Sequence, residues 1–241
     1  MISKSQAVLN HFASRSLRDT ADKDYIASRA AYRMQLDQQF LWLGLQSIEK
    51  YFKAILLFNG QSAKTGHDLN KALNRINKME DFKISLPEDS LEFIDYINNY
   101  GPNRYLDYPS YIPLESLLML DKTIWYVRRY CYYMRGISNE IEVNQLNLEL
   151  NRVESKYFKD RPNKLIINDG FLEKSIKNKL PSRKALIWKN FYFGQYHKKT
   201  IRNSFWRESF TNPTPFIHDD YYKILKEYVQ FPPPVHEHFS E

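Results

Sequence analysis

The sequence predicts a mainly α-helical protein, in which a bundle of four or five helices precedes a basic C-terminal extension of mixed structure. Glycine is scarce, with 7 in 241 residues, and this scarcity disfavours a turn-rich all-β fold. Apolar residues recur at helical spacing through most of residues 1–136. Residues 137–241 lack a sustained helical pattern and carry an excess of basic residues. We therefore expect two parts, a helical bundle over 1–136 and an extension over 137–241.

The N-terminal part of the bundle is expected to contain three helices. The first lies within residues 2–18, and its apolar face consists of Val8, Leu9, Phe12 and Leu17. The second starts at Asp22 or Asp24, either of which suits an N-cap. A long third helix spans about Asp37 to Phe58. Asn59–Gly60 ends this helix, because glycine adopts the left-handed conformation that follows many helices.

The next helices follow from capping residues and prolines. Thr65 and Asp68 have the spacing of a capping box, and an apolar helical pattern follows them. Pro87 precedes another helix, since proline is favoured near a helix start. Pro113 then opens a long helix that continues to about Met134. Short connections between these segments are typical of a helical bundle.

The extension has weaker signals. Residues 163–169, with the sequence NKLIIND, and 185–196, with the aromatic sequence ALIWKNFYFGQY, are candidate strands. Residues 219–231 are expected to form a helix. The final segment, 231–241, contains three consecutive prolines and is expected to be extended.

Charge is concentrated in the extension. Residues 152–207 hold 15 Lys and Arg against 4 Asp and Glu, a local excess of +11 within a chain of net charge +7. Such an excess suits contact with nucleic acid, and it also suits a solvated surface or an acidic partner. Within 183–207, aromatic side chains alternate with Lys and Arg, as in proteins that bind single-stranded nucleic acid. We expect the rings of Trp188, Phe191 and Phe193 in the core. Binding is expected from Lys198, Lys199 and Arg202.

Several classes of protein are disfavoured. Cys131 is the only cysteine, so an intramolecular disulfide is excluded and a cytoplasmic location is expected. No apolar stretch is long enough to cross a bilayer, and we expect no membrane association and no secretory signal. The histidines lack the ligand spacing of a zinc site, and no phosphate loop or dinucleotide motif is present. We therefore expect neither a metal nor a cofactor.

A polar stripe lies on the long helix beside its expected core face. The core face consists of Leu41, Leu45, Ile48, Phe52 and Ile55, and the polar stripe consists of Gln46, Glu49, Lys50 and Lys53. Glu49 and Lys53 are four residues apart, in the favourable order for an ion pair. The simplest interpretation is a solvated salt bridge. His67 follows at the next helix start, where it could serve chemistry or only capping and packing.

These residues resemble a known family. Residues 21–73 contain a second helix of the form Q…EKxxKAxL, followed by TGHDL at the start of the third, and the pattern over 21–135 is similar to the HEPN (higher eukaryotes and prokaryotes nucleotide-binding) family. The resemblance implies a four- or five-helix bundle that usually forms a dimer. Many members are metal-independent ribonucleases of toxin–antitoxin or antiviral systems, and others bind nucleotides or act as non-catalytic partners. The ribonucleases use an Arg followed four to six residues later by a His, beside a Glu-x-x-x-Lys pair.

The resemblance carries over to this chain only in part. Glu49 and Lys53 match the Glu-x-x-x-Lys pair, and Arg104 lies where the family's Arg belongs. The family's His is missing: the corresponding positions hold Tyr108, Pro109, Ser110 and Tyr111. Cleavage through a 2′-hydroxyl needs a proton acceptor near neutral pH, and an unperturbed tyrosine is a poor one. This departure favours binding over cleavage.

The main hypothesis is therefore a cytoplasmic, dimeric protein that binds RNA or a nucleotide, in a microbial defence or stress system that only the resemblance implies. Arg104 would hold phosphate, positioned by Glu49 and Lys53, and the remaining candidate contacts are Lys50, Tyr105 and Tyr108. Two rivals stay open. One is an active ribonuclease that uses His67 or a tyrosine as the base. The other is a dimeric interaction module that binds a cognate protein partner and no nucleic acid.

Overall fold

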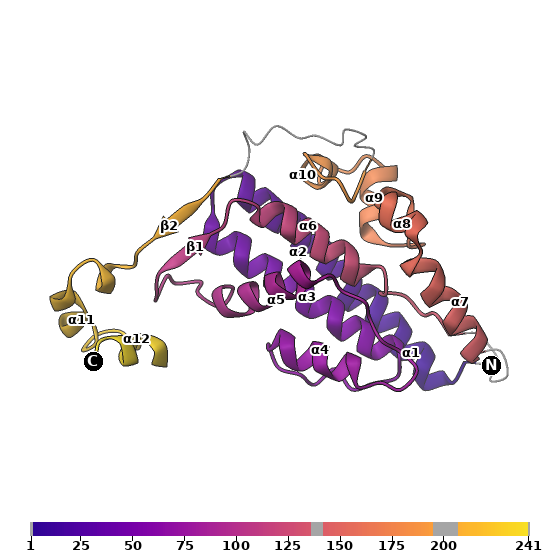
Figure 1. The fold of residues 1–241 in the computed structure, drawn as a ribbon, viewed down its shortest axis with the longest axis horizontal. Helices are drawn as coiled ribbons and strands as arrows, with labels where there is room; N and C mark the ends of the chain where they lie inside the picture. Colours follow the sequence, from indigo (N-terminus) through magenta and orange to yellow (C-terminus); the bar gives the residue numbers. More distant parts are fainter. Residues whose placement is uncertain (1, 136–141, 195–206, 241) are drawn as a thin grey trace.

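The computed structural model describes residues 2–135, 142–194 and 207–240, and it confirms a mainly α-helical fold (Figure 1). The bundle helices are α1 (Lys4–Phe12), α2 (Asp19–Arg33), α3 (Asp37–Phe58), α4 (Leu69–Asn77), α5 (Glu88–Tyr100) and α6 (Ser116–Arg128). The extension adds α7 (Glu142–Glu154), α8 (Lys156–Asp160), α9 (Phe171–Lys177), α10 (Arg183–Ile187), α11 (Asp219–Leu225) and α12 (Pro233–His238). Two short strands, β1 (Ser110–Ile112) and β2 (Ser209–Thr211), form one antiparallel pair.

Helix α3 is the centre of the bundle. It contacts α1, α2, α4, α5 and α6, and every residue of the predicted core face is buried. Gly44 allows the closest approach to its neighbours, because a Cβ at this position would lie 2.7 Å from the Cδ1 atom of Ile97 on α5. The bounds of α3 agree with the prediction, since its apolar residues repeat without interruption and Asn59–Gly60 follows them.

The first half of the extension packs on one side of the bundle. α9 and α10 contact α2, and Figure 1 shows α8, α9 and α10 on the side of the bundle opposite α4. Leu146, Val153, Leu172 and Leu186 from these segments belong to the same hydrophobic core cluster as the bundle. Trp188 and Phe193, predicted in the core, are partly buried against this cluster, and Phe191 is also partly buried. The division of the chain into two parts at residue 136 stays a prediction.

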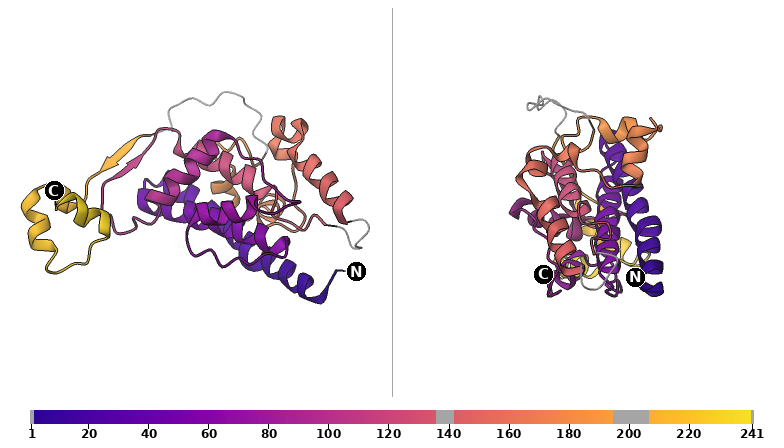
Figure 2. Two further views of the ribbon diagram at one scale, coloured as in Figure 1. Left: turned by 60° about the horizontal axis from the view of Figure 1, so that its bottom comes forward. Right: turned by 90° about the vertical axis from the view of Figure 1, so that its right-hand side faces the viewer.

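The end of the chain forms an arm that projects from the bundle in Figure 1 and in the left view of Figure 2. β2 pairs with β1, with Tyr111 opposite Phe210, and thereby ties the arm to the loop before α6. Beyond β2, α11 and α12 enclose a small separate cluster of buried Tyr222, Phe231 and Val235, against which Tyr108 packs. The arm therefore meets the bundle at the loop that contains Arg104.

Several predicted details near the N-terminus and the bundle end are wrong. The expected apolar face of the first helix is only partly correct: Leu17 packs against the core, but Val8 is 62% exposed and Phe12 50% exposed. A π-helical segment, Ala13–Arg18, joins α1 directly to α2, so Asp22 lies inside a continuous helix and caps nothing. Helix α6 ends at Arg128, where the chain turns before the described residues stop at 135.

The extension also differs from its prediction. Residues 163–169 form a 3₁₀ turn and an irregular segment, and residues 185–194 form the end of α10 and a loop, so neither candidate strand exists in the described residues. Residues 233–238 form α12, because consecutive prolines suit the first turn of a helix as well as an extended chain. The helix predicted over 219–231 is confirmed only in its first part, since α11 ends at Leu225.

Among the residues described, no helix combines the length and the apolar character needed to cross a membrane. The described residues also contain no group of three or more His, Cys, Asp or Glu side chains placed to hold a metal ion.

Candidate functional site

Glu49 is the centre of the polar stripe on α3, and each of its carboxylate oxygens has a partner. The side chain is only 5% exposed. Lys53 Nζ lies 2.5 Å from Oε1, as the four-residue spacing predicts. The ring atom Nδ1 of His67 lies 3.1 Å from Oε2. The pair is thus more than a solvated salt bridge, because a nearly buried carboxylate holds a lysine and a histidine together.

The loop before α4 brings His67 to α3. Gly66 has φ of 68°, in the left-handed region that suits glycine, and it turns the chain immediately before His67. Asp68 then caps α4, accepting a hydrogen bond from the backbone N–H of Lys71 at 3.0 Å. The predicted capping box is wrong, since Thr65 is buried and its Oγ1 has no hydrogen-bond partner in the described structure.

His67 presents its second ring nitrogen to solvent. Its side chain is 79% exposed, and Nε2 has no hydrogen-bond partner among the described residues. In the neutral tautomer that donates Nδ1–H to Glu49, Nε2 carries a free lone pair. A base oriented by a third group in this way is the arrangement that general acid–base chemistry requires.

Arg104 lies on the same face of α3 but nearer its N-terminus. Its guanidinium carbon is 4.1 Å from the ring centre of Trp42 and 5.5 Å from that of Tyr105. Arg104 is exposed and forms no ion pair within the described part of the chain, so its donors face solvent. Arginine stacked on rings and free of carboxylates suits phosphate and base recognition.

The distance between the two groups follows from helix geometry. Trp42 and Glu49 are seven residues apart, so they share one face of α3 and are separated by about 10 Å along its axis. No hydrogen bond or ion pair joins Arg104 to Glu49 or Lys53 in the described structure. The three predicted residues therefore lie on one face without direct contact, and their joint action stays a prediction.

Of the other residues predicted to contact RNA or a nucleotide, some lie beside Arg104 and others are paired elsewhere or lie outside the described residues. Lys50 points to α2, where its Nζ lies 2.5 Å from Asp24, so it is paired away from His67. Tyr105 is 79% exposed beside Arg104. Tyr108 donates its hydroxyl to the Asn99 carbonyl oxygen at 2.7 Å, and burial raises the pKa of Tyr108 to about 12. Lys198, Lys199 and Arg202 lie outside the described residues.

Asn103 shapes the loop that presents Arg104. Its buried amide accepts a hydrogen bond from the Asp107 backbone at 2.7 Å and donates one to the Tyr108 carbonyl at 2.7 Å. Leu106 has φ of 55° within this loop. Together these contacts hold Arg104 and Tyr105 on an ordered turn between α5 and β1.

A basic surface on α4 was missed by the sequence reasoning. Exposed Lys64, Lys71, Arg75 and Lys78 line a hollow of about 620 Å³ together with two asparagines. Lys71, Arg75 and Lys78 follow the i, i+4, i+7 pattern of one helix face, which the sequence already contained. This cluster is shorter than the basic region 152–207 and has a smaller excess of charge, so the charge count alone did not indicate it.

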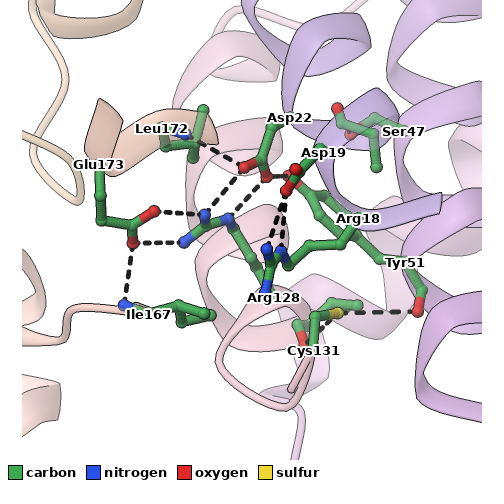
Figure 3. Close-up of polar contacts among 12 residues, drawn as sticks. Arg18, Asp19, Asp22, Ser47, Tyr51, Arg128, Cys131, Ile167, Leu172 and Glu173 are labelled. Carbon is green, nitrogen blue, oxygen red and sulfur yellow. Dashed lines mark hydrogen bonds and ion pairs between the residues drawn. The ribbon is translucent and has the colours of Figure 1, made fainter. Parts of the chain in front are cut away.

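A second polar cluster, between α2, α6 and α9, has a structural role. Figure 3 shows Arg128 between Asp22 of the bundle and Glu173 of the extension, with two hydrogen bonds to each carboxylate. Asp22 also accepts the Tyr51 hydroxyl at 2.5 Å and the Leu172 backbone N–H at 3.1 Å. Because the side chains of Arg128 and Asp22 are 3% and 0% exposed, this cluster has no open position for a ligand.

Comparison with known proteins gives one result that agrees with this geometry. A sequence profile described as the HEPN domain matches residues 14–144, which is more than half of the chain. Comparison with curated proteins and with solved structures finds no match. The matched region includes α2 to α6, the α3 stripe, His67 and Arg104. On this evidence, the chain belongs to the HEPN domain family.

Proposed function

We propose that this protein binds RNA through the face of α3 that carries Glu49, Lys53 and His67, together with Arg104. The observation that carries the proposal is the exposed guanidinium of Arg104, stacked on Trp42 and free of carboxylates in the described structure. Guanidinium groups bind phosphate with two parallel hydrogen bonds, and exposed rings such as Tyr105 stack on bases. Membership in the HEPN family supports the same class of ligand.

We further propose that the protein is a cytoplasmic homodimer of a microbial defence or stress system. This context rests on the family. A second copy would double the number of Arg104 loops available to one strand. Light scattering coupled to size-exclusion chromatography measures the mass, and a monomer at micromolar concentration would remove the dimer from the proposal.

The central test is a binding titration of Arg104→Ala with a matched control. Arg33 offers the control, because it is also an exposed arginine stacked on a tryptophan, with its guanidinium 5.3 Å from the ring of Trp188. Fluorescence anisotropy with labelled single-stranded RNA, and separately with labelled ATP, measures affinity. We expect Arg104→Ala to weaken RNA binding by about tenfold or more, which corresponds to the loss of about 1.5–3 kcal/mol typical of hydrogen bonds to charged groups. Arg33→Ala should leave binding unchanged, and equal losses in both variants would refute the assignment of Arg104.

A second candidate function, metal-independent RNA cleavage, is favoured by the contact between His67 and Glu49. Nε2 of His67 would accept the proton of a 2′-hydroxyl, whose oxygen attacks the adjacent phosphorus. The 5′-oxygen would leave and take a proton from water, giving a 2′,3′-cyclic phosphate and a 5′-hydroxyl. Tyrosine is a poor alternative base, because burial raises the pKa of Tyr108 to about 12 and a hydrogen bond to Glu208 raises the pKa of Tyr111.

Cleavage and binding are separated by one assay. Labelled RNA is incubated with the protein and EDTA, and the products are identified by their cyclic phosphate ends. We expect His67→Asn to abolish any cleavage while leaving RNA affinity within about threefold, since His67 would act on the proton and Arg104 on the phosphate. Cleavage that persists in His67→Asn would exclude this histidine as the base. The remaining rival, an interaction module without nucleic acid, is supported only if the wild type fails to bind RNA at low salt.

A further inference from the structure

The outer face of α4 is an exposed and basic part of the bundle surface. α4 packs on α3 and α5 through Leu69, Ala72, Leu73 and Ile76, which are all buried. The opposite face of α4 is exposed. Figure 1 shows that α8, α9 and α10 cover the other side of the bundle, so the described extension leaves this face open.

Two hollows join along this face. The first, of about 620 Å³, is lined by Lys64, Lys71, Arg75 and Lys78. The second, of about 540 Å³, shares Arg75 and Lys78 and continues to Arg135. Because the hollows share two residues, they form one trough, here called the α4 trough.

Four of the five cations of the trough have no ion-pair partner among the described residues. Lys64, Lys71, Arg75 and Lys78 are exposed, and none forms an ion pair with any residue of the described chain. Two of the three carboxylates that line the trough have partners: Asp68 caps α4, and Asp81 pairs with Arg135 at 2.7 Å. The third, Glu80, is exposed at the Arg135 end of the trough, and the cations of the trough outnumber these carboxylates by five to three. Four like charges within one hollow repel one another, and a bound polyanion would remove that repulsion.

The spacing of the cations fits a chain of phosphates. Lys71 and Lys78 are seven residues apart, and the face between them extends about 10 Å along the helix. Since phosphates follow one another every 3.4 Å or more along a strand, this length suits about three of them. The side-chain amides of Asn70 and Asn74 also line the trough and can contact sugars or bases. At its N-terminal end the trough includes Thr65 and Asp68, the residues on either side of Gly66 and His67.

We propose that the α4 trough is the track along which the phosphate backbone of RNA lies as it approaches His67 and the α3 stripe. This inference rests on the proposed RNA-binding function and adds a second surface to it. An alternative occupant is an acidic protein segment. Residues 207–240 of a second copy are the nearest example, since they hold 5 Asp and Glu against 3 Lys and Arg. The test separates the two occupants.

The test removes three charges from the trough and three from a control surface. The trough variant is Lys71→Gln, Arg75→Gln and Lys78→Gln, and glutamine keeps the helix propensity. The control variant is Lys156→Gln, Lys159→Gln and Lys177→Gln, three exposed lysines of α8 and α9 without ion pairs in the described structure. The net charge of both variants falls equally, so a general electrostatic effect is the same in each. Affinity for labelled single-stranded RNA is measured at about 50 and 200 mM salt, with Arg104→Ala in parallel.

The expected difference follows from counterion release. Each phosphate contact on a single strand contributes about 0.7 to the slope of log affinity against log salt, so three contacts contribute about 2. Over a fourfold change in salt, the wild type should therefore lose about 20-fold more affinity than the trough variant. The control variant should keep the wild-type slope. Circular dichroism spectra and melting temperatures establish that both variants fold.

The possible results separate the trough proposal from the proposed RNA-binding function. Equal slopes in the wild type and the trough variant, with Arg104→Ala still impaired, would overturn the trough and leave the proposed function standing. Equal effects of trough and control variants would also overturn it, because net charge alone would explain the result. If the wild type binds no RNA at low salt, both the trough and the proposed function fail. A trough variant that changes the mass in light scattering without changing RNA affinity would assign the trough to a protein partner.

Discussion

Removal of Arg128 should destabilise the whole fold, because this side chain neutralises two carboxylates between the bundle and the extension. Its Nε lies 2.7 Å from Asp22, and its two terminal nitrogens lie 2.9 and 2.7 Å from Glu173. The change Arg128→Met keeps the volume and removes the charge. Among the described residues, it leaves the fully buried Asp22 with only a tyrosine hydroxyl and one backbone N–H as partners. Breaking a buried pair in this way costs about 3–5 kcal/mol in the free energy of unfolding.

A loss of that size is large enough to measure in two ways. For a chain of this length, each kcal/mol lowers the melting temperature by about 2–4 °C, so we expect a decrease of about 6–20 °C. Urea unfolding followed by circular dichroism gives the free energy directly. The control is Arg75→Met, an exposed arginine in the last turn of α4, which should cost under about 1 kcal/mol.

A compensating substitution tests whether the loss of stability in Arg128→Met arises from the unpaired buried charge. Adding Asp22→Asn to Arg128→Met removes the unpaired buried charge, so the double variant should be more stable than Arg128→Met alone. If Arg128→Met loses less than about 1 kcal/mol, the carboxylates must be solvated and the reasoning is refuted. If the double variant is less stable than both single variants, the cost arises from packing rather than charge.

Three further predictions concern other contacts. Burial opposes the charged form of Glu173, but the charge of Arg128 outweighs the effect of burial and lowers the pKa of Glu173 below its ordinary value. The ion pair between Glu173 and Arg128 therefore stabilises the fold at pH 7, and this stabilisation is lost as the pH falls through the lowered pKa. Glu173→Gln should therefore flatten the dependence of melting temperature on pH below about 5, and an unchanged dependence would contradict this. Burial also raises the pKa of Cys131, so Ellman's reagent should react only after unfolding, and rapid reaction in buffer would contradict the structure. Asp37 accepts hydrogen bonds from Arg207, so Asp37→Asn should speed hydrogen exchange in β2 but not in α4; equal changes in both would indicate global destabilisation.

The sequence predicted those parts of the fold that depend on local patterns. The bounds of α3 and its buried face followed from apolar periodicity and a glycine stop, and the Glu49–Lys53 pair followed from a four-residue spacing. Asp22 was misinterpreted as a cap, because its true partner, Arg128, is 106 residues away. Such a pairing has no local signature.

The extension was hard to predict for a related reason. Residues 185–194 are rich in aromatic side chains, which favour strands as an isolated pattern. In the fold, Trp188 and Phe193 instead pack on the surface of the bundle, and Phe193 lies 5.5 Å from the ring of Tyr25. Tertiary packing thus overrides the propensity. The contact of His67 with Glu49 was also hidden, because it depends on how the loop at Gly66 turns.

The charge distribution shows why a count of basic residues does not locate a binding surface. In the basic region 152–207, Arg152 pairs with Glu149, Lys174 with Asp169 and Arg207 with Asp37. A cation held by a carboxylate adds little attraction beyond a Debye length of about 8–10 Å. The four exposed cations of the α4 trough have no such partners in the described chain, although their segment is far less conspicuous in the sequence. Lys156, Lys159 and Lys177 of the basic region are also without ion pairs in the described chain, but α8 and α9, which carry them, lie on the side of the bundle opposite α4. RNA should therefore follow the unpaired cations on α4 and at Arg104 rather than the densest run of Lys and Arg, and the comparison of trough and control variants measures this difference directly.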